Sequence, residues 1–182
     1  MKQGSFKEKI LVAKLNAKDA NAFEQIYNLY IDRIYRFIYF KVGTVQEAED
    51  LTSQTFLKIW QHATEGKLKT KESFQAFAYQ VARNTVIDHY RSSQKRRNEV
   101  DLQNAINISD VTSIEKDIDI KIDLKNLEEK IRQLKNEYQE VIILHYINEL
   151  STKEIAKIID KKKGATRVLL HRALKALKDK TL

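Results

Sequence analysis

Proline is absent from this chain of 182 residues, and glycine occurs only four times. These two residues interrupt helices most often, because proline lacks an amide hydrogen and glycine gains conformational freedom on unfolding. A hydrophobic content of 42% supplies enough apolar surface to build cores, which argues against a disordered chain. We therefore expect an all-α protein made of one ordinary domain or two small ones.

Apolar residues recur at helical spacing in three segments of the first half, which span residues 18–42, 45–64 and 73–97. Gly43 followed by Thr44 predicts the end of the first helix and the N-cap of the second. The polar stretch 62–72 predicts the loop before the third helix. The residues at this spacing are Phe23, Ile26, Tyr27, Tyr30, Ile34 and Ile38 in the first segment and Ala48, Leu51, Thr55, Ile59 and Trp60 in the second. The third helix is expected to bury Phe74, Phe77, Ala78 and Val81.

Composition changes between residues 98 and 123, where seven acidic residues accompany only two lysines and no period emerges. We interpret this stretch as an acidic interdomain linker, with a short irregular helix as the alternative. Leu127, Ile131 and Leu134 then share a helical face, and a further helix is expected around residues 141–146. The sequence thus predicts an N-terminal helical domain over 1–97, a linker over 98–124 and a C-terminal domain over 125–182.

The last part of the chain is a candidate helix-turn-helix. Ser151 and Glu154 predict a capping box for a short helix, and a final helix is expected after residues 160–164. At about 100° per residue, this final helix divides into an apolar and a basic face. The apolar face holds Thr166, Leu169, Leu170, Ala173 and Leu177, and the basic face holds Lys163, Arg167, His171, Lys175 and Lys178. Such a division suits a helix packed on its own domain and placed in a major groove, although a surface helix with a solvated basic stripe is the alternative.

The helix over 73–97 carries a second nucleic-acid signal. Tyr79, Arg83, Val86 and Tyr90 are predicted to share a face opposite the core, and polar Asn84 is adjacent to them. Aromatic rings stack on unpaired bases while arginine neutralises phosphates, so this face is typical of single-strand binding. The basic run 91–97, and the loop lysines Lys69 and Lys71 before the helix, extend it. The alternative is that the tyrosines cover a domain edge.

The formal net charge of +8 favours a polyanionic partner, with a merely basic surface as the alternative. The absence of cysteine excludes disulfides and thiolate sites. No apolar run of the roughly 20 residues needed to span a bilayer occurs, and the N-terminal residues lack a secretory signal pattern. We therefore expect a cytoplasmic protein without direct membrane insertion.

Three segments, taken together and in this order, resemble the extracytoplasmic-function (ECF) group of bacterial RNA polymerase sigma factors. The acidic helix of that group resembles EAEDLTSQTFLKIW at 47–60, and its −10-recognition helix resembles FQAFAYQVARNTVIDHYRSSQKRR at 74–97. Its −35-reading helix-turn-helix resembles LSTKEIAKIIDKKKGATRVLLHRALKAL at 150–177. The resemblance covers roughly residues 20–97 and 125–178.

The resemblance implies a sigma factor that directs core RNA polymerase to promoters, with the polymerase clamp and flap as partners, promoter DNA as ligand and an anti-sigma factor as inhibitor. The clamp would contact Asp50, Ser53 and Gln54. The −10 element would be contacted by Lys69, Lys71, Tyr79, Arg83, Asn84, Asp88, Tyr90 and Arg91. The −35 duplex would be contacted by Lys161, Lys162, Lys163, Thr166, Arg167 and His171. No catalytic residue, metal or cofactor is expected, and the acidic linker would pass through the enzyme interior.

Some positions depart from the family pattern. Ser53–Gln54 replaces Gln–Glu, Lys135 replaces a proline, Asp160 replaces a turn glycine, and Val168–Leu169 replaces Ser–Arg. The resemblance implies that the first of these changes weakens or alters contacts to the clamp. The last removes one DNA contact from the recognition helix but leaves its basic face intact.

Other functional classes fit less of the chain. A regulator that binds an operator through its helix-turn-helix would explain residues 150–178 but not 47–97. An enzyme would need a site, but the four histidines are scattered, and His145 with Glu149 lacks a third metal ligand. The acidic cluster at residues 47–50 matches the preference of carboxylates for the first turn of a helix. A membrane-surface protein would need aromatic anchors that the final helix lacks.

Overall fold

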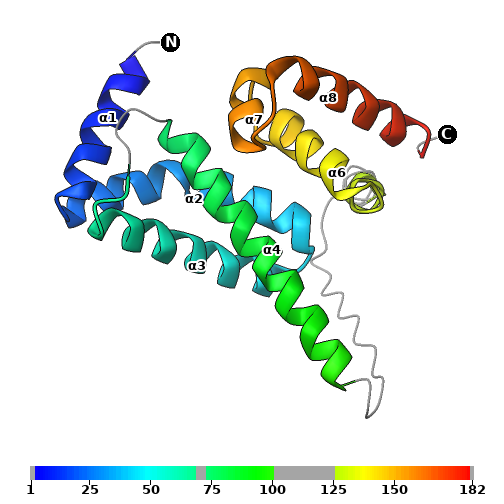
Figure 1. Cartoon of the computed structure of the whole chain (residues 1–182), viewed down its shortest axis with the longest axis horizontal. Coiled ribbons are helices and arrows are strands. Elements are labelled where there is room, and N and C mark those ends of the chain that lie inside the picture. Colours follow the sequence, from blue (N-terminus) through cyan, green and yellow to red (C-terminus); the bar gives the residue numbers. More distant parts are fainter. Residues whose placement is uncertain (1–2, 69–72, 101–125, 181–182) are drawn as a thin grey trace, which may run out of the picture.

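The structure, a computed structural model, describes residues 3–68, 73–100 and 126–180. Its elements are α1 (Gln3–Asn16), α2 (Ala20–Val42), α3 (Val45–Thr64), α4 (Phe74–Val100), α6 (Asn136–Ile142), the π-helix η1 (Ile143–Ile147), α7 (Thr152–Ile158) and α8 (Lys163–Lys178), shown in Figure 1. Residues 126–132 are also helical. Within the described ranges there is no strand, so the prediction of an all-α protein is confirmed. Lys69, Lys71 and most of the predicted linker lie outside the described residues.

The turn between α2 and α3 forms as the sequence predicts. Gly43 adopts a left-handed conformation with φ of 89°, and its N–H donates to the Tyr39 carbonyl at 2.8 Å. The Thr44 hydroxyl then accepts the Glu47 N–H at 3.4 Å, which caps the N-terminus of α3. A positive φ costs glycine little, so the chain reverses here within two residues.

The N-terminal core is formed by α1 to α4. Its buried side chains include Ile26, Ile34, Phe37, Ile59 and Ala78, all fully inaccessible to solvent. Helix α1 was not predicted, yet its Leu11, Val12 and Leu15 are buried and it contacts α2, α3 and α4. These three residues lie within little more than one helical turn, which is too short a pattern to identify the helix from periodicity.

Two predicted boundaries differ from the structure. Helix α3 spans Val45–Thr64, as the 45–64 segment predicts, so the predicted loop begins at Glu65 rather than at residue 62. Helix α4 continues to Val100, three residues past the predicted end at Arg97. The residues at both ends are compatible with helix, and composition alone marks such ends poorly.

The C-terminal unit contains the predicted pair of short helices. Ser151 and Glu154 form the predicted capping box, in which the Ser151 Oγ accepts the Glu154 N–H and the Glu154 carboxylate accepts the Ser151 N–H at 2.8 Å. Ile155 at 0% and Ala156 at 8% exposure pack beneath α8, which also contacts α6. Leu127 is 38% exposed, so its predicted place on the buried face with Ile131 is wrong. Ile131 in this helix and Leu134, two residues after its end, are the buried apolar residues of this segment.

The two units are docked against one another. Helix α4 contacts α7, and α2 contacts η1, so apolar side chains from both halves join in one continuous core. Figure 1 shows α4 crossing between the N-terminal helices and the C-terminal unit. The sequence predicts two domains on a tether. The structure adds that these two units share an interface.

Candidate nucleic-acid interface

The face of α4 that was predicted to bind an opened strand is partly buried. Tyr79 has 0% and Val86 has 1% exposure. The Tyr79 ring packs edge-on against Phe37 with centroids 5.6 Å apart, and burial raises the pKa of its hydroxyl to about 12. The prediction that Tyr79 stacks on a base is therefore wrong, because α4 is packed on more than one side and this ring belongs to the core.

The remaining polar residues on this helix differ in exposure. Asn84, Asp88, Tyr90 and Arg91 are exposed, as a DNA-contacting role requires. Asp88 pairs with Lys58 at 3.4 Å, and the Tyr90 hydroxyl donates to the Lys41 carbonyl at 2.6 Å. These contacts hold the side chains at the surface of the N-terminal unit.

Arg83 is engaged with the C-terminal unit. Its Nε donates to the Glu140 carboxylate at 2.7 Å, and the Glu140 side chain is only 8% exposed. The Gln80 amide donates to the Lys157 carbonyl at 3.0 Å, and the Lys41 ammonium donates to the Gln139 amide oxygen at 3.0 Å. A polar row therefore bridges the two units beside the candidate −10 face.

Sequence reasoning missed the partners in this row. Gln139 and Glu140 are polar residues at core-like positions of α6, and both are less than 9% exposed. Their signal in the sequence is a Gln–Glu pair directly before the apolar run 141–144. An apolar run of this kind predicts a helix buried on all sides, so the two polar side chains beside it would be cut off from solvent and would need protein partners. That pattern predicts partners but does not say which residues supply them.

The two faces of α8 are confirmed. Ala173 is buried and Leu169, Leu170 and Leu177 are half-buried, whereas Lys163, Arg167, His171, Lys175 and Lys178 are exposed. Lys161 and Lys162, which precede the helix, are also exposed, and Lys161 approaches Glu137 at 3.7 Å. The exposed basic side chains therefore lie together on the outer face of a helix-turn-helix.

Thr166 is placed differently. It has 0% exposure, and its hydroxyl donates to the Lys162 carbonyl at 3.2 Å inside the first turn of α8. The prediction that Thr166 contacts DNA is wrong, because its position on the apolar face points it into the domain. Val168, by contrast, is 50% exposed beside Arg167.

A third surface lies on α3. Asp50, Ser53 and Gln54 are exposed at successive turns of one helical face, and Leu57 continues this face with 56% exposure. A single exposed leucine is ordinary on a protein surface, so these side chains define an exposed face without identifying its partner.

The described residues give no support to a metal site. His145 is half-buried, and its Nδ1 lies 2.7 Å from the Leu150 carbonyl, while Glu149 adopts a left-handed conformation with φ of 56°. Among the residues placed by the structure, no three histidine or acidic side chains gather as metal ligands would. The helices in those ranges also include none that combines the length and apolarity needed to cross a bilayer.

Comparison with known families assigns both units. Residues 26–97 match Sigma-70 region 2, and residues 124–177 match Sigma-70, region 4. These matches cover the α2–α4 region and the helix-turn-helix unit, which carry the surfaces described above.

Two solved structures share the fold. CnrH in complex with the cytosolic domain of CnrY aligns with a TM-score of 0.71 at 18% identity, over 94% of this chain and 95% of CnrH. The sigma factor RpoE from Bartonella quintana, in complex with the anti-sigma factor NepR, aligns with a TM-score of 0.68 at 23% identity, over 87% of this chain and 96% of RpoE.

Curated relatives give the family. The chain is 34% identical over 169 residues to the ECF RNA polymerase sigma factor BldN of Streptomyces coelicolor, covering 92% of this chain and 63% of BldN. It is 29% identical over 176 residues to the ECF RNA polymerase sigma factor SigW of Bacillus subtilis, covering 92% of each. The chain thus spans less than two thirds of BldN and nearly all of SigW. It belongs to the ECF group of RNA polymerase sigma factors, which direct the polymerase to promoters, and is not a standalone operator-binding regulator.

Proposed function

We propose that this chain acts as a dissociable subunit of bacterial core RNA polymerase, with residues 1–97 reading the −10 element and residues 125–182 reading the −35 element. The observation that carries the division of labour is the exposed basic face of α8, which lies on a different unit from the exposed polar residues of α4. In this proposal the chain performs no catalysis, acts in the cytoplasm, and supplies the promoter address while the polymerase performs the chemistry.

The −35 duplex is contacted by α8. Lys161, Lys162 and Lys163 neutralise phosphates at the end of the helix that approaches the groove, and Arg167 donates to a guanine edge. His171 lies one turn farther along the same face. The exposed Val168 methyl groups supply an apolar contact to a thymine methyl, at a position where the family commonly has a polar residue.

The −10 strand is contacted by α4 and the loop before it. Asn84 and Asp88 bond base edges, Arg91 neutralises phosphate, and the Tyr90 ring, 45% exposed, supplies a stacking surface. Lys69 and Lys71 contribute from the loop. Arg83 joins this set when its bond to Glu140 is released.

The polymerase clamp binds the α3 face defined by Asp50, Ser53 and Gln54, with Leu57 as an apolar contact. The C-terminal unit docks on the flap, and the acidic residues of the linker, 98–124, pass through the enzyme interior in place of nucleic acid. An anti-sigma protein is the inhibitory partner, which is supported by the complexes of CnrH with CnrY and of RpoE with NepR.

In vitro transcription with purified chain and bacterial core polymerase on a library of promoter fragments tests the proposal. We expect initiation that depends on the chain and is lost when Arg83 and Asn84 are both changed to alanine. Asn28→Ala, an exposed asparagine on α2, is the matched control and retains initiation. Tight duplex binding by the chain alone, without initiation, would contradict the proposal.

A further inference from the structure

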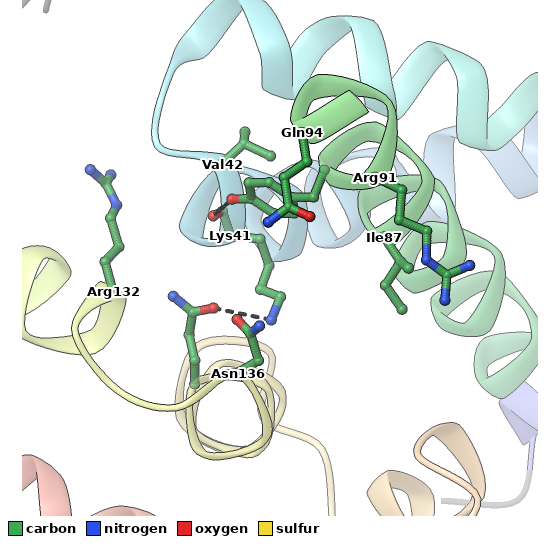
Figure 2. Close-up of a pocket in the computed structure, with 9 residues that line it drawn as sticks. Lys41, Val42, Ile87, Arg91, Gln94, Arg132 and Asn136 are labelled. Carbon is green, nitrogen blue, oxygen red and sulfur yellow. Dashed lines mark hydrogen bonds between the residues drawn. The ribbon is translucent and has the colours of Figure 1, made fainter. Parts of the chain in front are cut away.

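A cavity of about 510 Å³ lies between the two units. The N-terminal unit contributes Lys41, Ile87, Tyr90 and Arg91 to its walls, and the C-terminal unit contributes Arg132 and Gln139. Figure 2 shows the labelled side chains around this opening, with the Lys41–Gln139 hydrogen bond crossing from one unit to the other. The cavity therefore exists only while the two units are docked.

The charged side chains that line the cavity are all cationic. Lys41, Arg91 and Arg132 lie in its walls, and none of the lining residues is an aspartate or glutamate. The remaining polar lining is made of amide side chains and the Tyr90 hydroxyl, which are neutral. Positive charge gathered in a partly enclosed space attracts anions more strongly than the same charges on an open surface.

Each of the three cations has binding capacity to spare. The Arg91 side chain makes no hydrogen bond or ion pair with any other described residue. The Arg132 Nε is buried without a hydrogen-bond partner, while its Nη2 makes only long contacts of 3.5 Å to the Gly43 carbonyl and the Glu128 carboxylate. Lys41 bonds a neutral amide, and burial lowers the pKa of its ammonium.

The three cations line different sides of the same cavity. In Figure 2, Arg132 and Arg91 lie on opposite sides of the opening and Lys41 lies between them. A single carboxylate or chloride would satisfy one of these groups and leave the others unpaired. A short chain of phosphate groups would present anionic oxygens to several of them, and guanidinium groups bind phosphate oxygens in pairs.

We propose that this cavity binds a small ligand bearing two or more linked phosphates, with Lys41, Arg91 and Arg132 as its phosphate-binding side chains. Inorganic pyrophosphate and nucleoside diphosphates share this chemistry. Only a nucleoside diphosphate carries a base, which would pack against the apolar wall made by Ile87 and the Tyr90 ring.

Occupancy of the cavity favours the docked arrangement, because a ligand held by both units binds the docked state and not the separated one. The ligand then covers Tyr90 and Arg91, which we propose as −10 contacts. This regulatory consequence rests on the proposed function, whereas binding itself does not.

Titration calorimetry on the full chain tests the binding, with pyrophosphate, ADP and adenosine as probes. We expect pyrophosphate and ADP to bind and adenosine not to bind. Tighter binding of ADP than of pyrophosphate assigns the base to the Ile87 and Tyr90 wall, and equal affinities assign the site to the phosphates alone. The absence of binding by both phosphates at millimolar concentration would overturn the proposal.

Matched variants separate the cavity from general basic charge. Arg132→Gln and Arg91→Gln each lower the affinity for pyrophosphate at least tenfold, whereas Lys135→Gln, an exposed cation of the same C-terminal unit outside the cavity, leaves it unchanged. Arg91 is exposed, so its variant keeps the test valid if Arg132→Gln disturbs folding. An equal loss in Lys135→Gln would show nonspecific attraction and overturn the site.

Energy transfer between the units tests the consequence. Because the chain has no cysteine, dyes can be placed on Glu24→Cys and Lys178→Cys, both exposed positions. ADP is expected to raise the docked fraction in the parent chain but not in Arg132→Gln. Binding without any change in transfer would overturn the coupling. Neither titration calorimetry nor energy transfer depends on transcription, so a failure of this inference and a failure of the proposed function can be told apart.

Discussion

At the residue scale, Tyr79 belongs to the core and is not the DNA contact that the sequence predicts. Its hydroxyl is buried without a hydrogen-bond partner. Removing an unsatisfied buried hydroxyl relieves a desolvation penalty, so we expect Tyr79→Phe to raise the free energy of unfolding by about 1 kcal/mol. Chemical denaturation measures this change. Transcription by the variant should equal that of the parent chain, and a loss of open-complex formation at unchanged stability would instead return Tyr79 to the DNA surface.

Two buried tyrosines, Tyr79 and Tyr30, are expected to lower the stability of the chain at alkaline pH. Burial raises the pKa of Tyr79 to about 12 and raises that of Tyr30 as well, above the usual value of 10.0. Between pH 10 and pH 12 the Tyr79 hydroxyl is deprotonated in the unfolded chain but stays protonated in the folded chain. The free energy of unfolding is therefore unaffected below pH 10 and falls as the pH rises toward 12. Urea denaturation from pH 8 to 11 should show this decline, and Tyr79→Phe should make it shallower. An equal slope in both proteins would contradict the assignment.

Lys135 occupies a backbone conformation that suits proline. Its φ of −57° and ψ of 142° match the fixed ring geometry, and its N–H donates no backbone hydrogen bond to the described residues. Proline also narrows the unfolded ensemble, so Lys135→Pro is expected to stabilise the chain by about 0.4–1 kcal/mol. Thermal denaturation checks this, with Lys135→Ala as the control for loss of the side chain. A lower melting temperature for the proline variant than for the alanine variant would show that Leu134 cannot adopt the conformation required before proline.

At the element scale, the exposed arginines of α8 are expected to have different roles in DNA binding. Arg167→Ala removes the proposed guanine contact and should cost about 1–3 kcal/mol at one base position of the −35 element. Arg172→Ala, an exposed arginine of the same helix, is the matched control and should leave base preference unchanged. Holoenzyme binding to promoter variants measures both. Equal effects of the two substitutions at all base positions would mean that Arg167 contacts only phosphate.

At the scale of the whole molecule, the Arg83–Glu140 bond links the candidate −10 face to the docking of the two units. Glu140 is buried and Arg83 is about 39% exposed, so solvent screens the pair only in part. Glu140→Gln keeps the shape but removes the charge, and we expect it to shift the balance toward separated units roughly tenfold, or about 1.4 kcal/mol. Small-angle scattering or energy transfer measures the shift, and Glu137→Gln, an exposed acid on the same helix, is the control. An unchanged distribution in Glu140→Gln would assign docking to the apolar contacts alone.

Much of this molecule follows from its sequence alone. The positions of α2, α3, α7 and α8, the Gly43 and Ser151 caps and the two faces of α8 depend on interactions within a few residues, and local patterns report such interactions directly. The exposed basic contacts on α8 follow from the same periodicity, whereas the candidate contacts on α3 were implied by the resemblance to the ECF group. What the tertiary structure alone decided is which faces meet. Helix α4 packs against α2 and α3 and also against α7, so Tyr79 is buried on a side that periodicity left exposed. The Arg83–Glu140 bond and the cationic cavity join residues more than 40 positions apart, and no local pattern encodes which distant element will pack against a given face.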